Sequence, residues 1–227
     1  MPTIYINTKN DYKSKNDSSN CEYYSNLISS EIKNSLNSNA INLANNKIER
    51  EISEEMPDFS NINLQIDSEK NGSSDYTISI SYKSGNPQSQ RLKNILEINL
   101  KNIIPENTNI KTTEACENDF EEDIIIKINC SNEENFRWLR NNIENLSAAI
   151  IMSLTEYFGI PFIPYTYVIY GRAIKDANIF KRPNTKSEIV QTLTEGEKVK
   201  VLSQWEDWYV AEKNGTLGYI NTCFIDF

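Results

Sequence analysis

Residues 121–158 read EEDIIIKINCSNEENFRWLRNNIENLSAAIIMSLTEYF, and this stretch decides the fold. Its first ten residues hold four isoleucines around a single lysine, a run that is typical of a strand buried in a sheet. Asn132 follows as a helix N-cap, and the acidic residues after it suit the positive end of the helix dipole. Apolar residues then recur at helical spacing until Gly159 and Pro161 end the pattern. The stretch therefore predicts a strongly buried strand followed by one long helix.

Strand and helix patterns alternate over about the first 165 residues. Strands separated by helices favour a mostly parallel sheet that is flanked by helices on both faces, an α/β fold. Residues 75–85 alternate apolar and polar side chains, which indicates a half-exposed strand at an edge of the sheet. The expected strands span residues 4–7, 40–44, 61–66, 75–85 and 121–130, and the expected helices span residues 19–36, 47–56, 87–103 and 133–158.

The pattern changes near residue 167 to short strands separated by turns, with a hairpin signal at residues 213–215. The net charge changes at the same place, from −9 before residue 166 to zero after it. Short strands with turns indicate a small all-β, SH3-like barrel. We therefore expect an α/β domain at residues 1–162 and a barrel at residues 167–227.

The composition of the chain excludes several classes of protein. The net charge of −9 disfavours nucleic-acid binding, which needs a basic face. The chain has no apolar run of 18 residues and no signal-peptide pattern at its N-terminus, so no membrane span and no signal-directed export are expected. Four cysteines without a CxxC pair indicate reduced thiols in a protein made in the cytoplasm. The absence of histidine excludes Ser-His and Cys-His pairs and every imidazole-based metal site.

The C-terminal strands carry a motif of their own. Leu193, Gly196, Val199 and Val201 fit the run L-x-x-G-x-x-V-x-V, and WYVAEKNGTLGYI follows near the end of the chain. Nearly all of residues 167–227 thereby resembles the bacterial SH3 domains that are appended to cell-wall hydrolases. The resemblance implies binding to peptidoglycan peptides or to another wall polymer.

Aromatic planes beside charged groups suit a peptide or sugar ligand. Trp208 and Tyr209 fit the core pattern of the barrel, whereas Trp205 and Tyr219 are expected on an exposed recognition face. The predicted ligand-binding residues are Arg182, Trp205, Glu206, Asp207 and Tyr219.

The first domain resembles a second family. EDIIIKINCSNEENFRWLRNNIENLSAAIIMSLTEYFG and, upstream, SGNPQSQRLKNILEINLKNI are similar to the zinc-dependent N-acetylmuramoyl-L-alanine amidases of type 3, as found in endolysins. These enzymes cut the bond between glycan and stem peptide. The resemblance covers about residues 1–160 and implies their fold.

The resemblance also implies where the zinc site would lie. The family holds zinc with two His and one Glu, and a second Glu acts as the general base. In this chain the first His position falls at Asn10, the Glu ligand at Glu22, the second His at Asp67 and the catalytic Glu at Lys127. These four are vestigial positions, so we expect no catalytic residues, no bound metal and no zinc cofactor.

Two questions about these positions stay open. Glu22 and Asp67, with Asp11, Glu69 or a cysteine, form at most a carboxylate site, which prefers Mg²⁺ or Ca²⁺ to zinc. Lys127 either forms an ion pair with Glu22 or Asp67 in the old cleft, or points to solvent.

We therefore expect a non-catalytic, endolysin-like pseudoenzyme of bacterial or phage origin that binds peptidoglycan. It would serve as binder, scaffold or regulator, alone or with an active hydrolase or another protein partner. One alternative is an active amidase with a rearranged, His-free metal site. The other is a protein-interaction module of a secreted toxin or phage assembly. The expected place of action is the cell wall or the exterior, after lysis or release through a pore.

Overall fold

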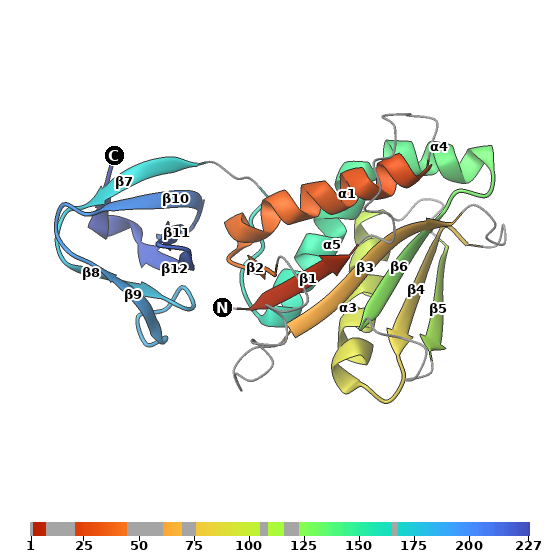
Figure 1. Ribbon diagram of the computed structural model, residues 1–227, viewed down its shortest axis with the longest axis horizontal. Coiled ribbons are helices and arrows are strands. Elements are labelled where there is room, and N and C mark those ends of the chain that lie inside the picture. Colours follow the sequence, from red (N-terminus) through yellow and green to blue (C-terminus); the bar gives the residue numbers. More distant parts are fainter. Residues whose placement is uncertain are drawn as a thin grey trace.

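The computed structural model describes residues 2–7, 21–44, 61–69, 76–104, 109–115, 123–164 and 168–227. Within these residues the chain forms two separate sheets (Figure 1). The first sheet has the strand order β2-β1-β3-β6-β4-β5. Its strands are β1 (Thr3–Asn7), β2 (Asn42–Leu43), β3 (Asn61–Glu69), β4 (Ile78–Lys83), β5 (Ile110–Ala115) and β6 (Ile124–Asn129).

The first sheet is mostly parallel, which confirms the prediction. All neighbouring strands in its described part run parallel except β4 and β6, which are antiparallel. The prediction that the strand at residues 75–85 forms an edge was wrong, because β5 pairs with the outer side of β4. The sequence IKTTEA of β5 is polar and largely exposed, so it gave no apolar pattern from which to expect a strand.

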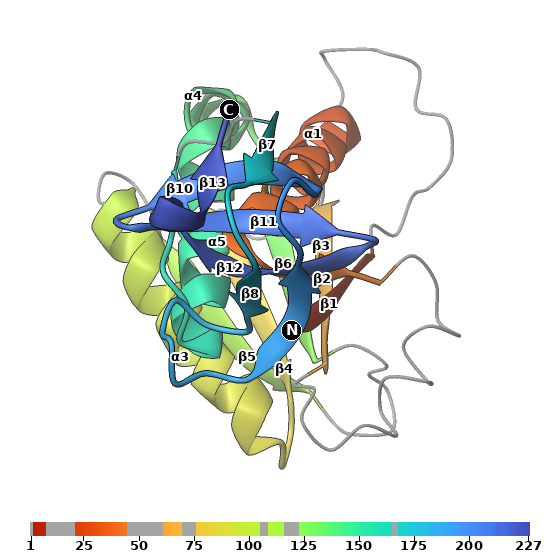
Figure 2. The same ribbon diagram turned by 90° about the vertical axis from the view of Figure 1, so that its left-hand side faces the viewer.

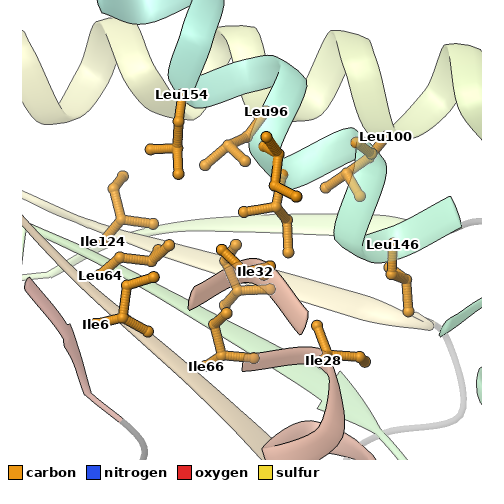
Figure 3. Packing of buried hydrophobic residues seen from close by; sticks show 14 of the residues in the cluster. Ile6, Ile28, Ile32, Leu64, Ile66, Leu96, Leu100, Ile124, Leu146 and Leu154 are labelled. Atoms are coloured by element: carbon orange, nitrogen blue, oxygen red, sulfur yellow. The ribbon is translucent and has the colours of Figure 1, made fainter. Parts of the chain in front are cut away.

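Helices α1 (Cys21–Leu36), α3 (Pro87–Ile103) and α5 (Ile143–Phe158) form one layer on a single face of the sheet. Figure 3 shows Leu64, Ile66 and Ile124 pointing from the strands into the side chains of this layer. The isoleucines and leucines of this face are almost completely buried. The expected helix at residues 47–56 lies outside the described residues.

The single helix expected after β6 is in fact two helices, α4 (Glu133–Asn141) and α5. Asn132 caps α4 as predicted, since its Oδ1 accepts a hydrogen bond of 2.8 Å from the backbone N–H of Asn135. The break falls at Asn142, whose Nδ2 donates to the Trp138 carbonyl at 2.8 Å and competes with the helical backbone bonds. Gly159 ends α5 in the left-handed region, at φ 63°.

The second sheet is entirely antiparallel in the pairings of its order β13-β7-β10-β11-β12-β8-β9. Asn214 and Gly215 both have positive φ, as a two-residue type I′ turn requires, so the predicted hairpin is present. No helix in the described part of the chain is long and apolar enough to cross a membrane. The strands are β7 (Ile169–Ala173), β8 (Ala177–Phe180), β9 (Ile189–Leu193), β10 (Lys198–Trp205), β11 (Trp208–Lys213), β12 (Thr216–Asn221) and β13 (Ile225–Asp226).

The two sheets belong to units that contact each other through a short 3-10 helix, η1 (Asn37–Asn39), at the end of α1. Figure 2 looks along the line between the units, with the all-β unit in front. Ser203 Oγ of β10 donates to the Ser38 carbonyl at 2.6 Å. A buried apolar group, here called the interdomain cluster, fills the contact; it comprises Ala40, Ile163, Leu202, Val210, Leu217 and Tyr219. The domain limits at residues 162 and 167 stay a prediction.

Candidate functional site

Strands β1, β3 and β6 run parallel, so their carboxyl ends lie side by side at one end of the first sheet, called the carboxyl edge below. Helix α1 begins at this edge, close to the end of β3 (Figure 1). The edge carries the predicted vestigial positions Glu22, Asp67 and Lys127. The fourth, Asn10, lies outside the described residues, as does Asp11.

Asp67 of β3 and Lys127 of β6 are register partners, and Ser79 of β4 continues the row. They alternate along their strands with the residues that face the helix layer, so all three lie on the opposite face of the sheet. Asp67 is buried and accepts a hydrogen bond from Gln65 Nε2, while Lys127 is half-buried. Lys127 therefore lies on the strand next to that of the buried Asp67 carboxylate. The backbones of the two strands are about 5 Å apart.

The sequence left open whether Lys127 forms an ion pair or points to solvent. The ion pairs between described residues include none from Lys127 to Glu22 or Asp67. Glu22 lies half-buried in the first turn of α1, where the helix dipole stabilises a carboxylate. The role of Lys127 stays a prediction.

The described residues at this edge offer fewer donors than the zinc that the amidase resemblance implies would need. A catalytic zinc needs three protein donors and an open position for water. The described positions offer the carboxylates of Glu22 and Asp67 and the cationic amine of Lys127, which repels a metal ion. No group of three or more Asp, Glu or Cys side chains in the described ranges is placed to hold a metal.

Polar contacts fasten the strand ends next to this row. Tyr76 donates its hydroxyl proton to Glu69 Oε2 at 2.6 Å, and Asn129 Nδ2 donates to the Tyr76 carbonyl at 2.8 Å. Asn129 Oδ1 accepts a bond of 2.9 Å from the backbone N–H of Ser131. These bonds link the end of β3 to the loop after β6, next to the row formed by Asp67, Lys127 and Ser79.

Cys130, in that loop, is disulfide-bonded. The expectation that the cysteines are reduced thiols was therefore wrong for this residue, because spacing along the chain does not reveal which thiols the fold brings together. Cys223 is free and exposed.

The structure separates the residues predicted to bind a ligand on the barrel. Arg182, Glu206 and Asp207 are exposed, and Glu206 occupies a left-handed turn conformation at φ 49° between β10 and β11. Trp205 is half-buried and packs against the interdomain cluster. Whether these side chains bind a ligand stays a prediction.

Tyr219 is 0% exposed, so its expected place on an exposed face was wrong. It lies in the interdomain cluster, where it packs with Ile163 and Leu202, and its hydroxyl has no hydrogen-bond partner among the residues that the structure describes. Burial raises the pKa of Tyr219, and the nearby positive charge of Arg182 opposes that rise. Tyr219 and Leu217 lie on the side of β12 that packs against the first unit, and the sequence gave no sign that this side is covered.

The sequence also missed the residues that fix this contact. Asn39 is fully buried and clamps the backbone of Ile163: the Ile163 N–H donates to Asn39 Oδ1 at 2.7 Å, and Asn39 Nδ2 donates to the Ile163 carbonyl at 3.2 Å. Asparagine is one of the commonest residues in this chain, so nothing distinguished this one from surface asparagines.

Solved structures show the same fold for the first unit. The N-acetylmuramoyl-L-alanine amidase from Clostridium difficile 630 matches 69% of this chain and 96% of its own, with 16% identity and a TM-score of 0.52. The catalytic domain of CwlV, an N-acetylmuramoyl-L-alanine amidase from Bacillus (Paenibacillus) polymyxa var. colistinus, matches 71% of this chain and 100% of its own, with 14% identity and a TM-score of 0.50. The first unit therefore has the fold of the N-acetylmuramoyl-L-alanine amidases, as the sequence predicted.

The second unit is a bacterial SH3 domain, since residues 175–226 match the model of that family. NlpC2 from Trichomonas vaginalis aligns with 27% of this chain at 21% identity, with a TM-score of 0.26. This chain covers 23% of the length of NlpC2. A search of curated proteins gives no match. The two units are called the amidase-like domain and the SH3 domain below.

Proposed function

We propose that this protein binds peptidoglycan without cutting it, as a pseudo-amidase that serves as a binder, scaffold or regulator at the cell wall. The amidase fold and the bacterial SH3 domain together support a role connected with peptidoglycan. The disulfide at Cys130 supports action outside the cytoplasm.

The observation that carries the non-catalytic part of the proposal is the row Asp67–Lys127. Hydrolysis of an amide by a metal-bound water needs a base to accept the proton of that water. An ammonium group already carries its full set of protons, and its charge also disfavours a metal ion at this edge. A chain without histidine has no imidazole to take over either task.

The test uses the full chain with purified sacculi. Pelleting with sacculi is expected, with no loss of turbidity and no new free amines, because amide hydrolysis would release one amine for each bond cut. Metal content of the same preparation is measured alongside, and an active amidase serves as the positive control.

The alternative is an active amidase with a rearranged, His-free metal site. Release of amines that a chelator abolishes, together with about one metal ion per chain, would establish that alternative. Substitution Lys127→Gln then separates the two further. It is expected to leave a pseudo-amidase inactive, whereas a change in the rate of amine release would establish the active amidase.

A further inference from the structure

A groove of about 570 Å³ lies between the two domains. It is at the opposite end of the sheet from Asp67 and Lys127, because Pro2, which lines it, precedes the first strand. In Figure 1 the N-terminus marks this end, next to the SH3 domain. The groove is lined by the start of α3, by the end of α5 with the residues after it, and by Lys181 and Arg182 of the SH3 domain.

The groove is basic although the whole chain is acidic. Arg91, Lys181 and Arg182 line it, and the lining residues that the structure describes include no carboxylate. The ion pairs of the described residues include none for Arg91 or Arg182. Lys181 pairs with Glu188 at 3.1 Å, but the Glu188 side chain is 62% exposed, so water screens that pair strongly. The groove thus retains positive charge.

Both guanidinium groups are held against the end of α5. The Arg91 Cζ lies 5.0 Å from the ring centroid of Tyr157. The Arg182 Nη1 lies 3.6 Å from the point where a Cβ at Gly159 would stand. The carbonyl end of a helix attracts cations, which helps to keep Arg182 there. The two arginines come from different domains, so the docked arrangement completes the site.

Two acidic groups of the first domain lie near the groove. Glu156 lines a neighbouring hollow together with Arg91, and its Oε2 accepts a hydrogen bond of 3.0 Å from Asn99 Nδ2. Asp123 acts electrostatically on the Tyr157 hydroxyl, but its oxygens accept hydrogen bonds from the Asn63 backbone N–H at 2.9 Å and from Asn86 Nδ2 at 3.4 Å. Asp123 is not among the described residues that line the groove.

We propose that the interdomain groove binds an oxyanion of the cell wall, the carboxylate of a stem peptide or the phosphate of an anionic wall polymer. Arg91 and Arg182 bind the oxyanion, since a guanidinium group offers paired N–H donors that match carboxylate and phosphate oxygens. Phe158, which is half-buried and lines the groove, packs against the chain that carries it. This inference rests on the proposed wall binding. It assigns part of that binding to a site that residues of both domains form together.

The test compares sacculi binding by the wild-type chain, by Arg91→Gln with Arg182→Gln, and by a control with the same change in charge. The control is Arg172→Gln with Lys186→Gln, two exposed residues of the SH3 domain that do not line the groove. The groove variant is expected to bind about tenfold more weakly or worse, because each lost charged hydrogen bond is worth a factor of that order. The control is expected to stay within about twofold.

The source of the oxyanion follows from sacculi treated with hydrofluoric acid, which removes phosphate polymers and leaves the peptides. Unchanged binding by the wild-type chain assigns the carboxylate, and lost binding assigns the phosphate. Equal binding by the groove variant and the control would overturn the inference while leaving the wall-binding proposal intact.

If the wild-type chain does not bind sacculi, the wall-binding proposal fails and the groove is tested directly. The probes are an N-acetylated acidic tripeptide and inorganic phosphate, and the readout is the NMR shift of the Gly159 amide. A saturable shift that the groove variant lacks supports the site on its own. Absence of a shift with both probes refutes it.

Discussion

The substitution Asn39→Ala tests whether the clamp on Ile163 joins the two domains. The Asn39 side chain is 0% exposed and makes three hydrogen bonds: two to the backbone of Ile163 and one from Nδ2 to the Ser35 carbonyl at 3.0 Å. Ile163 is also buried, in the interdomain cluster. After the substitution, the buried N–H and C=O of Ile163 lose the partners that they have in the structure.

The expected loss in free energy of unfolding follows from these groups. A buried donor or acceptor left without a partner costs about 1–3 kcal/mol, so the two groups of Ile163 together predict a loss of about 2–6 kcal/mol. For a chain of this size, each kcal/mol lowers the melting temperature by about 2–4 °C. The expected decrease is therefore about 4–24 °C.

Urea unfolding measures the effect with two probes. Tryptophan fluorescence is recorded in a Trp138→Phe background, because Trp138 lies in the amidase-like domain. It then reports on the interdomain contact through Trp205 and Trp208, which pack against its cluster. Circular dichroism at 222 nm reports on the helices of the amidase-like domain. In Asn39→Ala we expect the fluorescence transition to occur at a lower urea concentration than the helical one.

Asn37→Ala is the matched control, because Asn37 lies in the same 3-10 helix and is exposed. It is expected to change the free energy of unfolding by less than about 0.5 kcal/mol. Equal losses in the two variants would refute the reasoning that the clamp stabilises the contact.

Three further predictions concern the SH3 domain and the cysteines. Hydrogen bonds from Lys213 and from the Thr194 backbone lower the pKa of Glu197 to about 2. The stability that Glu197→Gln removes is therefore present above about pH 4.5 and is lost as the pH falls toward about 2, which urea melts across that range will show. Gly218→Ala places a methyl group 2.7 Å from a backbone oxygen of β8, so thermal melts are expected to show a loss of about 1–3 kcal/mol. In the native protein, alkylation followed by mass spectrometry is expected to label Cys223 and not Cys130; labelling of both without reductant would contradict the disulfide.

The sequence predicted the parts of the fold that local patterns determine. The isoleucine-rich strand β6, the cap at Asn132 and the stop at Gly159 each depend on a few neighbouring residues, and each is present. The break at Asn142 was missed because the apolar spacing continues across it, while the break arises from one side-chain hydrogen bond. Strand β5 was missed because an exposed edge strand needs no apolar face.

The candidate site likewise has features that the sequence predicted and features that it did not. The resemblance to the amidases placed Asp67 and Lys127 in one cleft, and the structure has them as register partners on parallel strands. The burial of Tyr219 and the clamp of Asn39 depend on how two units dock, which no local pattern contains. The groove between Arg91 and Arg182 depends on that docking as well.

The interdomain cluster has a practical consequence for mapping experiments. If the SH3 domain were excised, Leu202, Leu217 and Tyr219 would become solvent-exposed on one side of the fragment. Such a fragment would adhere to many surfaces, and its retention on sacculi would overstate specific recognition. Truncation would also remove half of the arginine pair, so the intact chain is the form in which its wall affinity has meaning.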